Sequence, residues 1–190
     1  MPQGGTTVKY STWTDLMPSQ NLTARFDQYA KTKNFAGALA WGDMGIFAAD
    51  FDQDDNWGSQ RFTPTNLKFK KSMFAYNSMI VSLGSDISAT GTYNNTWNTL
   101  TTVFQNIYST SFSTQSFVVN GTAVTTVGYN VSRPSNEDNW FITPSGTGFL
   151  VPKGNENVNV NFDTQKTPKQ DGSDYSNPAT SATVAKVFIN

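Results

Sequence analysis

The chain has 190 residues, a formal net charge of -1, and neither cysteine nor histidine. Without these two residue types there is no disulfide, no thiolate or imidazole metal ligand and no serine-histidine triad. The near-zero charge gives no basic field for nucleic acid, and no apolar run is long enough to span a membrane. We therefore expect a soluble protein without nucleic-acid or membrane partners.

Residues 1–34 are predicted to be irregular, because Gly4-Gly5, Pro18 and scattered polar residues leave only one candidate short helix, at 22–30. Met1 is followed by neither a basic nor an apolar stretch, so we expect no signal peptide in this sequence. From residue 35 to residue 190, strand-sized apolar runs alternate with turn residues, and no helical period is sustained. The pattern predicts an all-β, antiparallel β-sandwich domain over 35–190.

The first two strands are predicted at 36–40 and 44–51, on either side of Trp41-Gly42-Asp43, which has the composition of a turn. An exposed tryptophan in such a turn could stack on a sugar ring. Trp41 is therefore a candidate substrate-binding residue. The alternative is that Trp41 is an ordinary turn residue.

The segment 50–58, DFDQDDNWG, is predicted to be an acidic loop. Counting from Asp50, the sixth and twelfth positions are Asp55 and Arg61, where an EF-hand requires glycine and glutamate. The EF-hand interpretation therefore fails. A simpler calcium site built from some of these carboxylates is the alternative to a solvated loop; otherwise we expect no metal and no cofactor.

The central stretch, 66–88, contains two strand-like runs joined by Tyr76-Asn77-Ser78. In the first run, apolar residues alternate with Lys68, Lys70 and Lys71, which indicates one buried and one solvated face. These lysines are candidates for contact with glycan carboxylate or sulfate groups, against the alternative of a polar strand face. The second run, 79–83, is almost continuously apolar, so we predict a strand covered on both faces and a hairpin in the middle of a sheet.

The rest of the chain continues the pattern of short strands and turns. Asn120-Gly121 is the strongest hairpin signal, because a type I′ turn needs positive φ at both positions. The other predicted strands are at 99–107, 115–119, 123–127, 140–143, 148–151, 158–162 and 182–189. The last of these would leave an exposed sheet edge unless it is paired.

The phrase LKFKKSMFAYNSMIVSLGSDIS at 67–88, followed by TLTTVFQN at 99–106, resembles the β-sandwich part of polysaccharide lyase family 8, the chondroitin, hyaluronan and xanthan lyases. The resemblance extends to 1–7, 35–51 and 138–151, and it looks closest to the chondroitin ABC type. It implies a secreted or periplasmic parent enzyme that degrades chondroitin sulfate or hyaluronan, which contain uronic acid, by β-elimination.

In that family, a helical toroid that precedes the sandwich supplies the catalytic Asn, His, Tyr and Arg. The resemblance thus implies no catalytic residue in this chain, which would serve as scaffold and as one wall of the cleft that holds an acidic polysaccharide. It also implies an upstream toroid domain as partner, and a sandwich that continues beyond residue 190. Many members carry an acidic residue before a glycine-rich turn, where this chain has AWGDMG at 40–45 and Asp43 as the nearest carboxylate. The resemblance thus implies Asp43 as a second candidate substrate-binding residue, against the alternative of an ordinary turn residue.

Two other function classes fit the residues. A freestanding carbohydrate-binding sandwich would hold glycan through surface aromatics without chemistry, and would bind on its own. A structural sandwich from a viral or surface assembly would have no sugar function.

Overall fold

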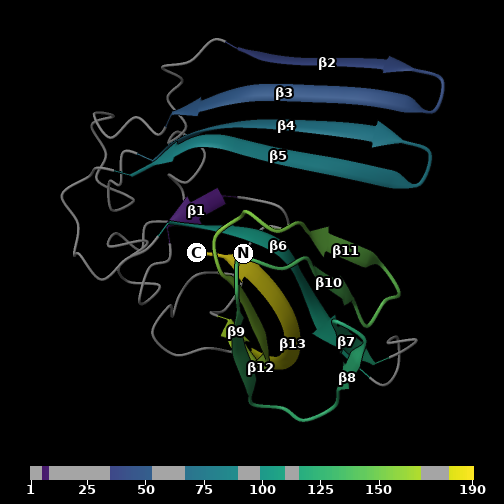
Figure 1. The fold of residues 1–190 in the computed structure, drawn as a ribbon, viewed down its shortest axis with the longest axis vertical. Coiled ribbons are helices and arrows are strands. Elements are labelled where there is room, and N and C mark those ends of the chain that lie inside the picture. The colour runs from purple at the N-terminus through teal and green to yellow at the C-terminus, as the bar shows by residue number, and fades with distance from the viewer. Residues whose placement is uncertain (1–5, 9–34, 53–66, 90–98, 110–115, 168–179) are drawn as a thin grey trace. The chain divides into compact units, whose positions relative to one another are not determined.

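The computed structural model describes residues 6–8, 35–52, 67–89, 99–109, 116–167 and 180–190, and every regular element within these ranges is a β-strand. Figure 1 shows the strands in order along the chain. All strand pairs given a residue register are antiparallel. The predicted all-β, antiparallel sandwich class is therefore confirmed.

Tertiary contacts divide the chain into two compact units. One comprises Met1–Thr7 with Leu100–Asn190, and the other comprises Val8–Thr99. The expectation of one domain over 35–190 stays a prediction. Within the segment predicted to be irregular, Thr6–Val8 forms strand β1, while the candidate helix at 22–30 lies outside the described residues.

The unit that contains the C-terminal half is a two-sheet sandwich. One sheet has the strand order β1-β6-β13-β12-β9 and the other has the order β11-β10-β7-β8. The strands are β6 (Thr99–Tyr108), β7 (Phe117–Val119), β8 (Thr122–Val124), β9 (Tyr129–Arg133), β10 (Asn139–Ile142), β11 (Gly148–Val151), β12 (Val158–Thr167) and β13 (Thr180–Ile189).

The sandwich core is built by strand alternation. Val158, Val160 and Phe162 on β12 are buried, as their period of two predicts. From the other sheet, Phe117 and Phe141 join the same cluster, and Phe117 meets the ring of Phe104 edge-on at 5.8 Å. Both sheets thus fill one core. The last strand, β13, is not at the edge of the sheet, because it pairs with β12 on one side and with β6 on the other.

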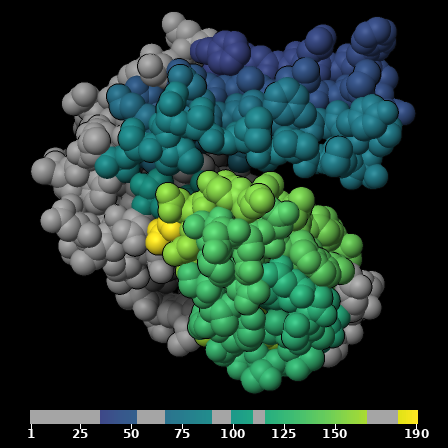
Figure 2. Space-filling view, in the orientation of Figure 1, coloured from purple at the N-terminus to yellow at the C-terminus, as the bar shows by residue number. Residues whose placement is uncertain are grey.

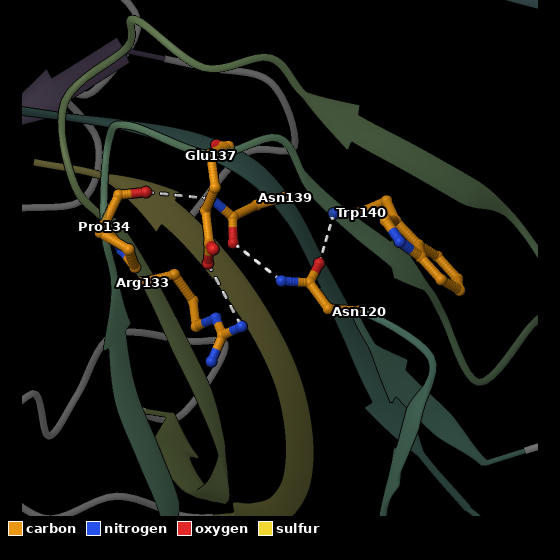
Figure 3. Close-up of polar contacts among 6 residues, drawn as sticks. All are labelled: Asn120, Arg133, Pro134, Glu137, Asn139 and Trp140. Carbon is orange, nitrogen blue, oxygen red and sulfur yellow. Dashed lines mark hydrogen bonds and ion pairs between the residues drawn. The ribbon is translucent and has the colours of Figure 1, made fainter.

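The Asn120-Gly121 hairpin forms as predicted, with φ values of 46° and 85°. The Asn120 amide group also joins this turn to the neighbouring hairpin: its Nδ2 donates to Asn139 Oδ1 at 3.1 Å and its Oδ1 accepts from the Trp140 backbone N–H at 2.8 Å (Figure 3). Asn139 is buried, and its own Nδ2 donates to the carbonyls of Pro134 and Glu137. A fully paired buried amide of this kind fixes how the two turns lie.

The other unit contains a four-stranded antiparallel sheet in the order β2-β3-β4-β5. Its strands are β2 (Ala36–Trp41), β3 (Met44–Asp52), β4 (Lys68–Tyr76) and β5 (Met79–Ser88). The two predicted hairpins are confirmed, with turns at Gly42-Asp43 and Asn77-Ser78. Asp50–Asp52, predicted to open an acidic loop, instead completes strand β3.

Two predictions about β5 are wrong. Its residues from Met79 to Ser88 are all exposed, and in the described part of the chain β5 is the edge of the sheet rather than its middle. The apolar run at 79–83 predicts a strand that is buried on both faces, but an apolar run shows only that burial by other elements would be favourable. The run does not specify which other part of the protein would pack on it.

Candidate functional site

The turns that close the two hairpins of the β2–β5 sheet lie side by side. The backbone N–H of Asn77, in the β4–β5 turn, donates to the carbonyl of Asp43, in the β2–β3 turn, at 3.3 Å. Both turns use the left-handed region, at Gly42 with φ 57° and Asn77 with φ 51°, which glycine and asparagine tolerate. The sequence thus brings two tight turns to one end of the sheet.

Trp41 is the last residue of β2 rather than part of the turn. The residues paired with it on the neighbouring strands form a row across the sheet. Trp41 pairs with Met44, Met44 pairs with Tyr76, and Tyr76 pairs with Met79. Directly paired residues of an antiparallel sheet point to the same face. The four side chains therefore form one line beside the turns, which we call the Trp41–Met79 row.

All four members of the Trp41–Met79 row are exposed. The exposed fraction of the residue is 81% for Trp41 and 55% for Tyr76, and the fractions for Met44 and Met79 are close to that of Tyr76. Figure 2 shows the turn end of this sheet, coloured blue to teal, with no grey atoms over it in this view. Two exposed aromatic rings with a flexible methionine between them make an adaptable, largely apolar surface.

The apolar surface continues along the same face of the sheet. One row further from the turns, Leu39, Ile46, Phe74 and Val81 are paired in the same way and are also exposed. A contiguous exposed patch of this kind usually marks an interaction surface. The turn end differs from the rest of the patch because polar turn residues border its aromatic rings.

The polar groups beside the row suit sugar hydroxyls. The Asp43 side chain is exposed, and its carboxylate offers acceptors only, whereas the exposed Asn77 amide offers donors and an acceptor. Aromatic faces contact the apolar C–H surface of a ring, and the adjoining polar groups pair with its hydroxyls. The structure thus brings both predicted substrate-binding residues, Trp41 and Asp43, to one place. It adds Tyr76 and Asn77, which the sequence analysis did not single out for binding.

The strand lysines lie at the opposite end of the sheet from Trp41. Lys68 forms an ion pair with Asp52 at 3.1 Å, and Lys70 with Asp86 at 2.6 Å. The hydrogen bond and the charge of Asp86 raise the pKa of Lys70. Their pairing with carboxylates leaves the predicted lysine contact with an acidic glycan without structural support.

Lys71 differs from its two neighbours because it is half-buried. It sits opposite the buried Ala49 on β3 and opposite Gly84 on β5. Burial lowers the pKa of Lys71 by disfavouring its charged form.

The candidate calcium ligands are only partly described. Asp52 is paired with Lys68, and Asp54 and Asp55 lie outside the described residues. Among the residues that the structure describes, no three acidic, histidine or cysteine side chains gather as a metal-ligand group. In the described ranges, no helix is long and apolar enough to cross a bilayer.

Comparison with known proteins matches residues 3–190 to the model of the polysaccharide lyase family 8 super-sandwich domain. A search of curated proteins returned no significant match. Among solved structures, the chain is similar to a Paenibacillus xanthan lyase, with a TM-score of 0.58 and 16% sequence identity over 98% of this chain. The chain spans only 16% of the length of that lyase.

Proposed function

The chain belongs to polysaccharide lyase family 8, as its super-sandwich domain, and we propose that it forms the β-sandwich part of an exported lyase. The substrate is an acidic polysaccharide that contains uronic acid. Chondroitin sulfate and hyaluronan are the substrates that the hairpin phrase at 67–88 favours, while the similar solved structure is that of a xanthan lyase.

In this proposal the chain is a scaffold and a cleft wall, and the parent protein's helical toroid carries out the chemistry. β-Elimination removes the C5 proton of the uronate, expels the glycosidic oxygen and leaves a C4–C5 double bond. It needs a base, an acid and a group that stabilises the charge developing on the carboxylate. The chain contains no histidine that could act as base or acid.

The observation that carries the proposal is the Trp41–Met79 row. Trp41 and Tyr76 are exposed on one face, and Asp43 and Asn77 lie in the turns that follow them along the chain. Aromatic rings that stack on sugars bind and orient the polysaccharide without using charge. This suits a cleft wall that holds the polysaccharide while another domain carries out the reaction. Asp43 would accept hydroxyl hydrogen bonds, since its charge disfavours a neighbouring uronate carboxylate.

The test is a lyase assay that follows the ultraviolet absorbance of the unsaturated uronate. We expect no product from this chain alone with chondroitin sulfate, hyaluronan or xanthan, and product from the parent protein with at least one of them. Trp41→Ala in the parent should raise KM and leave kcat nearly unchanged, because the row binds substrate and transition state alike. Turnover by the chain alone would show that the chemistry is in this domain.

The exposed row also favours a second candidate, a freestanding carbohydrate-binding module. That function requires measurable affinity of this chain for a glycan and no cleavage by the parent protein. Polysaccharide binding by the isolated chain, combined with an inactive parent, would select it.

A further inference from the structure

A polar hollow lies on the sandwich sheet at the point where that sheet becomes narrower. Strand β9 pairs with β12 only from Arg133 opposite Val158 to Tyr129 opposite Phe162. Beyond Phe162, β12 continues through Thr167 and is paired with β13. The end of β9 thus leaves a step beside β12, among the described strands. Figure 1 shows β9, β12 and β13 side by side.

The hollow at this step has a volume of about 300 Å³, which is at the lower end of the range for small-ligand sites. Its lining combines two asparagine amides, a glutamine amide, a threonine, a carboxylate, an ammonium group and one buried valine. The residues are Asn130, Asn161, Gln165, Thr164, Asp163, Lys186 and Val184. Asn161, Asp163 and Gln165 alternate along β12 with the core residues Val160 and Phe162, so they lie on the other face of the sheet. Asn130 and Lys186 are paired with Asn161, and Val184 is paired with Asp163, so these three share that face.

Three of these side chains form a row on adjacent strands. Asn161 on β12 is paired with Asn130 on β9 and with Lys186 on β13. The Asn161 Nδ2 donates to Asn130 Oδ1 and to the Val160 carbonyl. These bonds fix the amide and leave Asn161 Oδ1 and Asn130 Nδ2, which have no partner among the described residues, as an acceptor and a donor for a ligand.

The remaining polar groups extend this set along β12 and β13. Asp163 Oδ1 accepts from the Thr164 backbone N–H at 2.7 Å, and the exposed carboxylate keeps Oδ2 as an acceptor. Lys186 Nζ lies 5.7 Å from the centre of the Phe188 ring, a cation-π arrangement that holds the side chain against the sheet. The lining thus supplies both acceptors and donors, together with the apolar side chain of Val184.

This chemistry matches a sugar ring better than other common ligands. Each sugar hydroxyl both donates and accepts, and amides, a carboxylate and an ammonium group can pair with several hydroxyls at once. A phosphate or sulfate group would meet the negative charge of Asp163. A nucleotide base would find no aromatic ring on which to stack, because none lines the hollow.

We propose that this hollow is a second, non-catalytic sugar-binding site, which holds one hydroxyl-rich ring of the polysaccharide at a place distinct from the Trp41–Met79 row. The inference rests on the proposed function for the nature of the ligand. Such a site would add a second point of attachment for the same polymer, which raises the apparent affinity for long chains over that for short ones.

The test is a titration of the 190-residue chain with a hyaluronan hexasaccharide and with a xanthan oligosaccharide, followed by nuclear magnetic resonance. The side-chain amide signals of Asn130, Asn161 and Gln165 should shift with either probe. Asp163→Ala should weaken this response at least tenfold. The matched control is Asn159→Ala, since Asn159 lies on the same strand and face but does not line the hollow, and its response should equal that of the unchanged chain.

The outcomes separate this proposal from the proposed function. Shifts confined to Trp41, Tyr76 and their neighbours would overturn the second site while leaving the cleft wall intact. No shift at Asn161 with either probe, or equal weakening by Asp163→Ala and Asn159→Ala, would also overturn it. A response of the hollow in a protein whose parent shows no lyase activity would support the site and contradict the lyase. Asp163 is exposed, so its replacement should preserve the fold, which the dispersion of the Val160 and Val187 methyl signals checks.

Discussion

The sandwich and the β2–β5 sheet have the same alternation of apolar and polar residues, but they differ in how far the apolar side chains are buried. In the sandwich, Phe104, Phe117 and Phe141 have no exposed surface, and two sheets share one core. In the β2–β5 sheet, Ala49 is the only described apolar residue that is buried, while large side chains such as Phe74 are exposed. Alternation selects which side chains share a face, but only a second layer removes that face from water.

This difference assigns separate roles to the two regions. Burial of phenylalanine and valine side chains stabilises the sandwich by about 1.5–3 kcal/mol each. The exposed face of the β2–β5 sheet contributes much less to folding and is available for contact. The lesson is that apolar side chains of equal kind stabilise one region and form a binding surface in the other.

The largest effect expected from this comparison is on the free energy of unfolding. Phe141→Ala should lower it by about 3–5 kcal/mol, because it leaves a cavity among tightly packed rings. Phe74→Ala, the matched change on the exposed sheet, should lower it by less than about 1 kcal/mol. Urea unfolding followed by circular dichroism measures both. Similar decreases in the free energy of unfolding for the two variants would contradict the different roles of the two regions.

A smaller effect is expected from the buried amide that joins two turns of the sandwich. Asn139→Ala removes the partner of the Asn120 amide and of the Pro134 and Glu137 carbonyls, so unfolding should be easier by about 1–3 kcal/mol. The control is Asn155→Ala, since the exposed Asn155 also donates to a proline carbonyl, at Pro152. Thermal unfolding should separate the two variants; equal midpoints would contradict the role assigned to Asn139.

The smallest effect concerns pH and Lys71. Burial lowers its pKa in the folded state, so the folded state binds that proton less well than the unfolded state does. The free energy of unfolding should therefore rise as the pH increases from the folded pKa to the ordinary lysine value. Lys71→Met should raise stability at neutral pH and flatten this alkaline slope. Denaturation between neutral and alkaline pH measures the slope, and an unchanged slope in the variant would refute the assignment.

Most of the strands and their turns could be predicted from local patterns. The Asn120-Gly121 turn and the alternation of Val158, Val160 and Phe162 each depend on neighbouring residues alone. The pairs Trp41 with Met44 and Tyr76 with Met79 also follow from the two turns. The family followed from the phrase at 67–88, which the match over residues 3–190 confirms.

The remaining features depend on pairing between distant segments. The register that places Met44 opposite Tyr76 joins the two hairpins into one row, and neither hairpin specifies it. For the same reason the exposure of β5 and the end of β9 beside β12 could not be predicted. The place of Asn161 beside Asn130 and Lys186 depends on the sheet order, which local patterns do not give.

Affinity measurements decide whether the Trp41–Met79 row binds polysaccharide. Equilibrium binding of the preferred polysaccharide should be measured for the unchanged protein, for Trp41→Ala and Tyr76→Ala, and for Trp140→Ala as a control on a partly exposed tryptophan of the sandwich. We predict a loss of about 1–2 kcal/mol in binding free energy, or roughly five- to thirtyfold in affinity, for each row variant, and no change for Trp140→Ala. Equal affinity of all four proteins would contradict it.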